Sequence, residues 1–315
     1  MTDAAQQDNR PFRILSLDGG GAKGFYSLGA LREIEALSGQ RLSTSFDLIF
    51  GTSTGAIIAA LLALGRSVDE IYTLYREHVP RIMRPKSPRE KTRALANLAS
   101  DVFQDAQFTD VRTGLGIVTT KWAIEQPMIF KGDPAQAHGR VATFVPGFGV
   151  PICEAVQASC SAYPFFERKV VTTSAGDRIE LADGGYSANN PTLYAIADAT
   201  NALGHRPEDL RVVSVGVGTY PEPSPPIWSK MRWARYLLSV QLLQKTLDIN
   251  TSSMDQLRAI LYDRVPTVRI NGAYAQPEMA TDLFEHDLDK LSILHQRGRD
   301  SFSAEEARLR QMLQE

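Results

Sequence analysis

Short continuous apolar runs alternate with longer helical patterns along the first 220 residues. The runs at 12–17, 46–50 and 211–217 are bulky and mostly apolar, which is typical of strands buried on both faces of a sheet. Residues 25–37 place apolar side chains three or four positions apart, and residues 56–64 are apolar on every side, so both predict helices that cover such a sheet. This alternation predicts an α/β fold with a mostly parallel sheet.

Weaker patterns continue the alternation. Ser67 and Glu70 have the spacing of a capping box, which predicts the start of a helix that reaches residue 79. Further strands are predicted at 115–120, 141–145 and 178–182, helices at 154–159 and 191–199, and a polar loop at 130–140.

A proline-rich linker divides the chain. Residues 221–226 predict a rigid connection, and residues 228–245 then predict a helix that packs an apolar face on the sheet. Residues 1–11 are polar and predict a disordered lead-in. We therefore expect an α/β domain at 12–220 and a mostly helical extension at 221–315 that packs on the same domain.

The composition of the 315 residues narrows the class of protein. Charged residues make up 22% and hydrophobic residues 43%, and a net charge of −2 gives no sign of a DNA or RNA partner. Cys153 and Cys160 have no second pair to complete a zinc site, so we expect no metal and two reduced thiols. The N-terminus lacks a signal-peptide core, and the longest apolar run, 56–64, is about half a membrane span. We expect a cytoplasmic protein with peripheral membrane contact.

A Gly-x-Ser-x-Gly sequence lies between the strand at 46–50 and the helix at 56–64. This context is the one that a nucleophile elbow requires, because a tight turn exposes the serine hydroxyl and the glycines avoid collisions there. The helix N-terminus would offer N–H groups to a developing oxyanion. The elbow consists of Gly51, Thr52, Ser53, Thr54 and Gly55.

A glycine-rich loop follows the first strand and begins at Asp18. Its Gly-x-Gly-x-x-Gly spacing formally matches a dinucleotide-binding fingerprint, but the acidic residue expected about 20 positions later is missing at 38–43. The loop fits better as an oxyanion hole for the serine, because its N–H groups form an anion cradle. The predicted oxyanion hole consists of Gly19, Gly20, Gly21, Ala22, Lys23 and Gly24, together with the N–H of Thr54. Lys23 either adds positive potential there or faces solvent.

A third motif, Asp183-Gly184-Gly185, follows the strand predicted at 178–182. The carboxyl ends of parallel strands meet at one edge of a sheet, so we expect this motif to share a site with the elbow and the glycine loop. The small residues at 158–162 would pack under that site, and Phe165 and Phe166 could line an apolar channel.

The most basic stretch of the chain is 81–93. Pro80, Pro85 and Pro88 predict an irregular loop there. It is interpreted either as a solvated surface loop or as a binding site for the phosphates of a lipid head group or of a nucleotide. The candidate ligands of such phosphates are Arg81, Arg84, Lys86 and Arg89.

Four motifs together resemble the patatin-like phospholipases, in that family's order and over residues 12–220: the glycine loop, the elbow, 158–166 and 183–191. The resemblance implies a three-layer α/β/α fold and metal-free acyl hydrolysis of membrane phospholipids at the inner membrane surface. It places the catalytic pair on Ser53 and Asp183. Burial would raise the pKa of Asp183 and make it a more useful base.

The compact size also resembles bacterial patatin-like effectors of anti-phage defence. That resemblance implies activation by a cyclic di- or trinucleotide, with a homo-oligomer forming on activation. Two alternatives stay open. One is a serine esterase whose triad adds His205, His286 or His295 to Ser53 and Asp183, and the other is a non-catalytic regulator that binds a nucleotide in the glycine loop.

Overall fold

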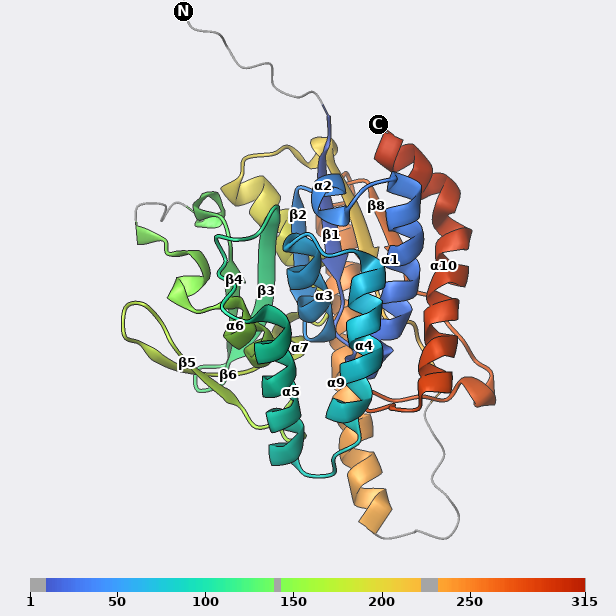
Figure 1. The fold of residues 1–315 in the computed structure, drawn as a ribbon. Helices are drawn as coiled ribbons and strands as arrows, with labels where there is room; N and C mark the ends of the chain where they lie inside the picture. The colour runs from blue at the N-terminus through green and yellow to red at the C-terminus, as the bar shows by residue number, and fades with distance from the viewer. Residues whose placement is uncertain (1–9, 139–142, 222–231, 315) are drawn as a thin grey trace, which may run out of the picture.

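The strands form a single sheet at the centre of the molecule (Figure 1). The structure is a computed structural model that describes residues 10–138, 143–221 and 232–314, with side chains from residue 239 in the last range. The strands are β1 Phe12–Leu17, β2 Leu48–Thr52, β3 Gly114–Lys121, β4 Gln126–Lys131, β5 Lys169–Thr172, β6 Arg178–Asp183, β7 Leu210–Val215 and β8 Thr267–Ile270.

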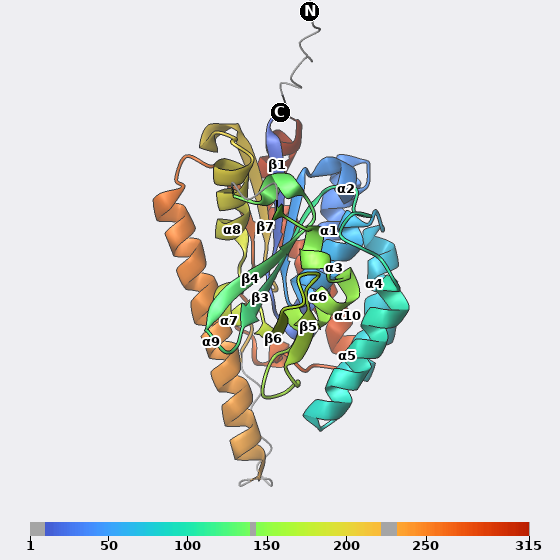
Figure 2. The ribbon, with the colours of Figure 1, turned by 90° about the vertical axis from the view of Figure 1, so that its left-hand side faces the viewer.

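The helices cover both faces of this sheet, as the three-layer prediction requires. Figure 2 shows α8 and α9 on one side of the sheet and α1 to α5 on the other. The helices are α1 Gly24–Ser38, α2 Leu42–Ser45, α3 Thr54–Ala63, α4 Val68–Met83, α5 Pro88–Phe103, α6 Ile152–Ser159, α7 Gly185–Ala188, α8 Thr192–Ala197, α9 Arg232–Leu261 and α10 Leu288–Gln314. The three-layer α/β/α fold class is therefore confirmed.

The sheet follows the order β5-β6-β3-β2-β1-β7-β8, with β4 paired to β3. Strands β3, β2, β1, β7 and β8 are parallel, and the central residues of the first four are mostly apolar and buried, as expected of a sheet covered on both faces. Helix α3 is buried along its whole length, which explains why residues 56–64 are apolar on every side.

One edge of β3 pairs with two strands in succession. Strand β2 pairs with it up to Thr52 and Val118, and β6 takes over from the next residue, where Asp183 lies opposite Thr119. Strand β4 occupies the other edge of β3. Because β6 is antiparallel to β3, β2 and β6 meet end to end, and the residue after Thr52 comes beside Asp183. The expected shared edge is correct, but β6 reaches it as an antiparallel strand rather than a parallel one.

The structure corrects two assignments between β3 and α6. Phe130 and Lys131 belong to β4, whereas the sequence placed them in a loop; Pro127 is tolerated because β4 has no strand beyond it. The strand predicted at 141–145 is absent from residues 143–145, which form a 3-10 turn and irregular chain, while 141–142 lie outside the described residues.

The predicted irregular loop at 81–93 is also wrong. Helix α4 continues through Pro80 to Met83, and α5 begins at Pro88, so only four residues separate the two helices. Ser87 and Glu90 form a capping box, and Pro88 occupies the first turn, where its missing N–H costs nothing. The prolines therefore mark a helix start rather than a long loop.

The C-terminal segment adds a strand as well as helices. Strand β8 pairs with β7 and has no counterpart among the predicted elements. Of the predicted linker at 221–226, only Pro221 is among the described residues. The helix predicted at 228–245 is described from Arg232 onward, as the first part of α9. Most of the predicted lead-in also lies outside the described residues, and Arg10 within it pairs with Asp47 at 2.6 Å.

Candidate active site

Ser53 occupies a sharp turn between β2 and α3. Its φ of 53° and ψ of −123° form a left-handed conformation that a residue with a side chain rarely adopts. A Cβ on Gly51 would collide with the Gly55 carbonyl oxygen, and a Cβ on Gly55 would collide with the Leu17 carbonyl oxygen. The two glycines thus allow the turn to close against β1 while the serine stands at the N-terminus of α3.

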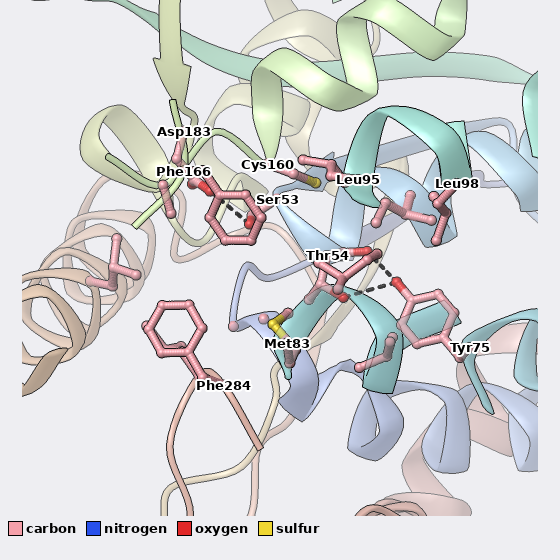
Figure 3. A pocket seen from close by; sticks show the side chains of 18 residues that line it. Ser53, Thr54, Tyr75, Met83, Leu95, Leu98, Cys160, Phe166, Asp183 and Phe284 are labelled. Atoms are coloured by element: carbon pink, nitrogen blue, oxygen red, sulfur yellow. Dashed lines mark hydrogen bonds between the residues drawn. The ribbon is translucent and has the colours of Figure 1, made fainter. Parts of the chain in front are cut away.

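The Ser53 hydroxyl donates directly to Asp183, with 2.8 Å between Oγ and Oδ2 (Figure 3). The other carboxyl oxygen accepts the N–H of Gly185 at 2.7 Å. Asp183 is 2% exposed, and burial raises its pKa to about 7, although both hydrogen bonds oppose the rise. A carboxylate with this pKa can accept a proton from a serine far better than an exposed one.

Ser159 positions the nucleophile from the last turn of α6. Its Oγ accepts the N–H of Ser53 at 2.9 Å and donates to the Val118 carbonyl at 2.6 Å. This side chain therefore ties the elbow to the centre of the sheet. The small residues around Ser159 predicted only packing there, and its hydroxyl among buried neighbours was the available signal for this role.

Most N–H groups of the glycine loop are already engaged. Gly19 donates to the Asn189 carbonyl at 2.9 Å, and Ala22 donates to the Leu283 carbonyl at 3.0 Å. Lys23 and Gly24 donate within the loop. Within the described residues, the N–H groups of Gly20, Gly21 and Thr54 have no acceptor, and all three residues line the pocket beside Ser53.

Contacts with distant segments hold the glycine loop in place. Gly21 has φ +57°, and a Cβ there would collide with the Leu283 carbonyl oxygen. The Asn189 amide donates to the Gly19 carbonyl at 3.2 Å, a role that sequence reasoning did not assign. Lys23 does not face solvent, since it is 2% exposed, and burial lowers its pKa against the opposing charges of Asp248 and Asp282.

The pocket at Ser53 is narrow and apolar. Its cavity is about 60 Å³, far below the roughly 300–1,000 Å³ of ordinary ligand pockets. Figure 3 shows the rings of Phe166 and Phe284 on the side near Asp183. Its walls come from α3, α4 and α5, from the segment after α6, from α9 and from the loop before α10. The side chains are those of Ile57, Tyr75, Val79, Ile82, Met83, Leu95, Leu98, Cys160, Ala162, Phe166, Leu247, Leu283 and Phe284.

None of the described residues that line this pocket is a histidine. His205 stacks on Phe12 at the start of β1, with 4.1 Å between ring centroids. His286 contacts the Phe284 carbonyl, and His295 packs against Tyr72. In a Ser-His-Asp triad, a histidine accepts the hydrogen bond of the serine hydroxyl. Here Asp183 accepts the hydrogen bond of the Ser53 hydroxyl directly.

Cys160 lies in the wall of this pocket, whereas Cys153 does not line it. Cys153 and Cys160 are free thiols, as predicted, and burial raises the pKa of Cys160 well above its usual range. Across residues 10–138, 143–221 and 232–314, no cluster of three potential metal ligands is present. Over the same residues, no helix has both the length and the apolar character needed to span a bilayer.

The predicted phosphate ligands lie on the short turn between α4 and α5 and on the helix ends beside it. Arg81, on α4, pairs with Glu77 at 3.2 Å. Arg84 and Lys86 lie in the turn and Arg89 in the first turn of α5, and all three are exposed. Figure 1 shows this turn projecting at the same end of the molecule as the N-terminal part of α9.

The family model for patatin-like phospholipases matches residues 15–196, more than half of the chain. The chain therefore belongs to the patatin-like phospholipase family, as its motifs predicted, and is an enzyme of that class.

Individual relatives narrow this family assignment. A cUMP-AMP-activated phospholipase of Escherichia coli is 64% identical over 96% of this chain and 93% of its own length. A cGAMP-activated phospholipase of Vibrio cholerae is 27% identical over 65% of this chain and 63% of its own length. Among solved structures, human GIVD cytosolic phospholipase A2 shares the fold, with a TM-score of 0.50 and 12% identity over 98% of this chain and 60% of that one.

Proposed function

We propose that the chain hydrolyses acyl esters of membrane glycerophospholipids through a Ser53–Asp183 dyad, and that a cyclic dinucleotide switches it on. One observation carries the catalytic part. The Ser53 hydroxyl donates directly to a buried carboxyl group whose pKa is about 7, and no histidine stands between them. A serine hydroxyl needs such a neighbouring base to become a nucleophile.

In the first half of the reaction, Ser53 Oγ attacks the ester carbonyl carbon while its proton passes to Asp183 Oδ2. The negative charge that develops on the carbonyl oxygen is stabilised by the N–H groups of Gly20, Gly21 and Thr54. Collapse of the tetrahedral intermediate breaks the ester bond, and Asp183 returns the proton to the leaving lysophospholipid alkoxide. The product on the enzyme is an acyl–Ser53 ester.

In the second half, a water molecule loses a proton to Asp183 and attacks the acyl–Ser53 carbonyl. The intermediate collapses, the fatty acid leaves, and Ser53 Oγ regains its proton from Asp183. The N–H group of Gly185 remains on Oδ1 throughout and keeps Oδ2 directed at the serine.

The walls of the pocket support a lipid substrate. Apart from Ser53, Thr54, Asp183, the Cys160 thiol and the Tyr75 hydroxyl, the pocket is lined by apolar side chains and glycine, which suit an acyl chain. The exposed Arg84, Lys86 and Arg89 suit the phosphate groups of an anionic membrane surface. We assign these cations to peripheral contact with the inner face of the cytoplasmic membrane.

Two observations support activation by a cyclic dinucleotide. The 64% identical relative carries the name cUMP-AMP-activated phospholipase. In addition, the cavity of about 60 Å³ beside Ser53 is too small for a fatty acyl chain, so the chain described here needs a change of shape before it can act. A closed resting enzyme spares the membrane of its own cell.

The test measures fatty acid release from phosphatidylethanolamine–phosphatidylglycerol vesicles by mass spectrometry, with and without cyclic UMP–AMP. We expect release that depends on the nucleotide and that falls by about 10³-fold or more in Ser53→Ala. The exposed Ser292→Ala serves as matched control and should stay within about twofold of the parent. Release that survives Ser53→Ala would overturn the dyad, whereas equal release without any cyclic dinucleotide would overturn only the activation.

A further inference from the structure

A second cavity lies at the end of the sheet opposite Ser53. It measures about 510 Å³ and is formed by the last residues of α3, the first turn of α4, the last residues of α5 and the segments before α2 and β3. Leu64 and Phe103 contribute apolar surface to it, and Arg41, Arg66 and Arg112 contribute guanidinium groups. We call it the arginine groove. Its volume falls within the roughly 300–1,000 Å³ typical of small-molecule sites.

The three arginines reach the arginine groove from separate parts of the chain. Arg41 precedes α2, Arg66 lies in the turn between α3 and α4, and Arg112 precedes β3. The N–H of Arg112 donates to the Ala63 carbonyl at 2.8 Å, which joins this segment to the end of α3. Gly65 has a φ of +90°, which favours glycine, and the Arg112 guanidinium lies directly beside it.

These guanidinium groups keep unused hydrogen-bonding capacity. Over the parts of the chain that the structure describes, Arg41 and Arg112 form no ion pair, and Arg66 makes a long contact of 3.5 Å with Glu70. Glu70 is already held by the N–H and hydroxyl of Ser67 at 2.7 and 2.9 Å. Planar guanidinium groups of this kind bind phosphate oxygens through two parallel N–H bonds.

Two further carboxylates make the arginine groove unlike a site for a simple polyanion. Asp110 accepts the N–H of Gln107 at 2.8 Å and is thereby fixed in its own turn. Asp105 also borders the groove. A ligand that combines anionic phosphodiesters with hydrogen-bond donors on bases and riboses can use both the arginines and the carboxylates. A cyclic dinucleotide has this combination.

The arginine groove is linked to the active site by shared helices. Helices α3, α4 and α5 border the groove at one end and supply walls of the narrow pocket at Ser53 at the other. Figure 1 shows the three helices side by side over one face of the sheet. A ligand held between their ends would shift α4 and α5 relative to α3, and such a sliding of packed helices can widen the far pocket.

We infer that the arginine groove is the binding site of the cyclic dinucleotide activator, and that occupancy there opens the acyl pocket at Ser53. This inference rests on the proposed activation. It assigns the activator to Arg41, Arg66 and Arg112 rather than to the turn between α4 and α5. A ligand that binds the open form more tightly than the closed form shifts the population toward activity.

Calorimetric titration of the full chain with cyclic UMP–AMP tests the site directly. We expect the Kd to rise at least about tenfold in Arg41→Ala and in Arg112→Ala, with a smaller rise in Arg112→Lys, which keeps the charge but loses the planar fork. The matched control is Arg206→Ala, an exposed arginine paired with Asp209 at 2.8 Å, which should keep the parent Kd. Hydrogen exchange should show protection of residues 102–104 when cyclic UMP–AMP is bound.

The outcomes separate the site from the activation itself. A parent that binds none of a panel of cyclic dinucleotides overturns both. A parent that binds, together with Arg41→Ala and Arg112→Ala variants of unchanged Kd, overturns only the site. Loss of binding in the triple variant Arg84→Ala/Lys86→Ala/Arg89→Ala would place the activator at the turn between α4 and α5. That result would also overturn the assignment to the arginine groove. Displacement of the nucleotide by inorganic phosphate at equal concentration reduces the groove to a simple anion site and contradicts the inference.

Discussion

Two aspartates at the carboxyl edge of the sheet share a local sequence and differ in their surroundings. Asp18 follows β1 and Asp183 ends β6. Three glycines follow the first and two follow the second, and each aspartate is 2% exposed. Asp18 accepts two N–H bonds from Arg269, at 2.9 and 2.5 Å. Asp183 accepts the hydroxyl of Ser53 and the N–H of Gly185, and it pairs with no cationic side chain of the described residues.

The difference shows that burial alone does not make a carboxyl group a base. Burial raises the pKa of Asp18, and the charge of Arg269 opposes that rise and holds the carboxylate in an ion pair. Burial also raises the pKa of Asp183 to about 7, and only neutral donors oppose it. The first aspartate therefore fastens the glycine loop to β8, whereas the second remains able to take up and return a proton.

The largest expected effect comes from removing the basicity of Asp183. Asp183→Asn keeps the shape and the acceptor for Gly185, but an amide cannot take the proton of Ser53. We expect turnover to fall by about 10³-fold or more, measured as fatty acid release from phospholipid vesicles in the presence of the activator. Turnover within tenfold of the parent would mean that Asp183 resembles Asp18 in being structural.

The pH dependence of unfolding provides the control for that variant. The folded pKa of about 7 exceeds the unfolded value near 3.9, so the folded parent holds an extra proton between these values. The parent should therefore lose up to about 4 kcal/mol of unfolding free energy as the pH rises from about 4 to 7, a loss that Asp183→Asn should lack. Parallel curves for the two proteins in urea unfolding would contradict the shifted pKa.

Arg269→Met tests the other side of the comparison. It leaves Asp18 buried without its cation, which typically costs about 3–5 kcal/mol of unfolding free energy. Urea unfolding at pH 7.5 measures the loss. The double variant Asp18→Asn/Arg269→Met removes both charges and should recover at least half of it. A single variant as stable as the parent would show that the ion pair does not hold the glycine loop.

The elements nearest the nucleophile could be predicted because local rules suffice there. Residues 46–64 carry a buried strand, an elbow and an apolar helix in an unbroken order, and the structure has them as β2, the Ser53 turn and α3. The last turn of α4 and the whole of α5 were missed, although the sequence contains the start signal of α5. Ser87, Pro88 and Glu90 have the spacing of a helix start, in which a proline is favoured in the first turn, so the prolines here do not indicate a loop.

Other features depend on partners that local patterns do not reveal. Strand β8 is four residues long and forms only because β7 offers a free edge. Its Arg269 reaches Asp18 across 251 positions of sequence. Likewise, Leu283 and Phe284 line the pocket at Ser53 from the loop before α10. The boundary expected at residue 220 therefore separates stretches of sequence but not parts of the site.

The smallest expected effect concerns the histidines. If one of them were the base, Asp183 would only orient it, and the contrast with Asp18 would lose its catalytic meaning. His205 stacks on Phe12 at the opposite end of β1 from Ser53, and His286 contacts the Phe284 carbonyl at 3.2 Å. His205→Ala and His286→Ala should therefore keep turnover within about tenfold of the parent, which is less than about 1.4 kcal/mol of barrier. Release of fatty acid under activating conditions measures this, with urea unfolding to establish that each variant is folded. A thousandfold loss in a folded His286→Ala variant would identify that side chain as the proton carrier and would replace the dyad with a triad.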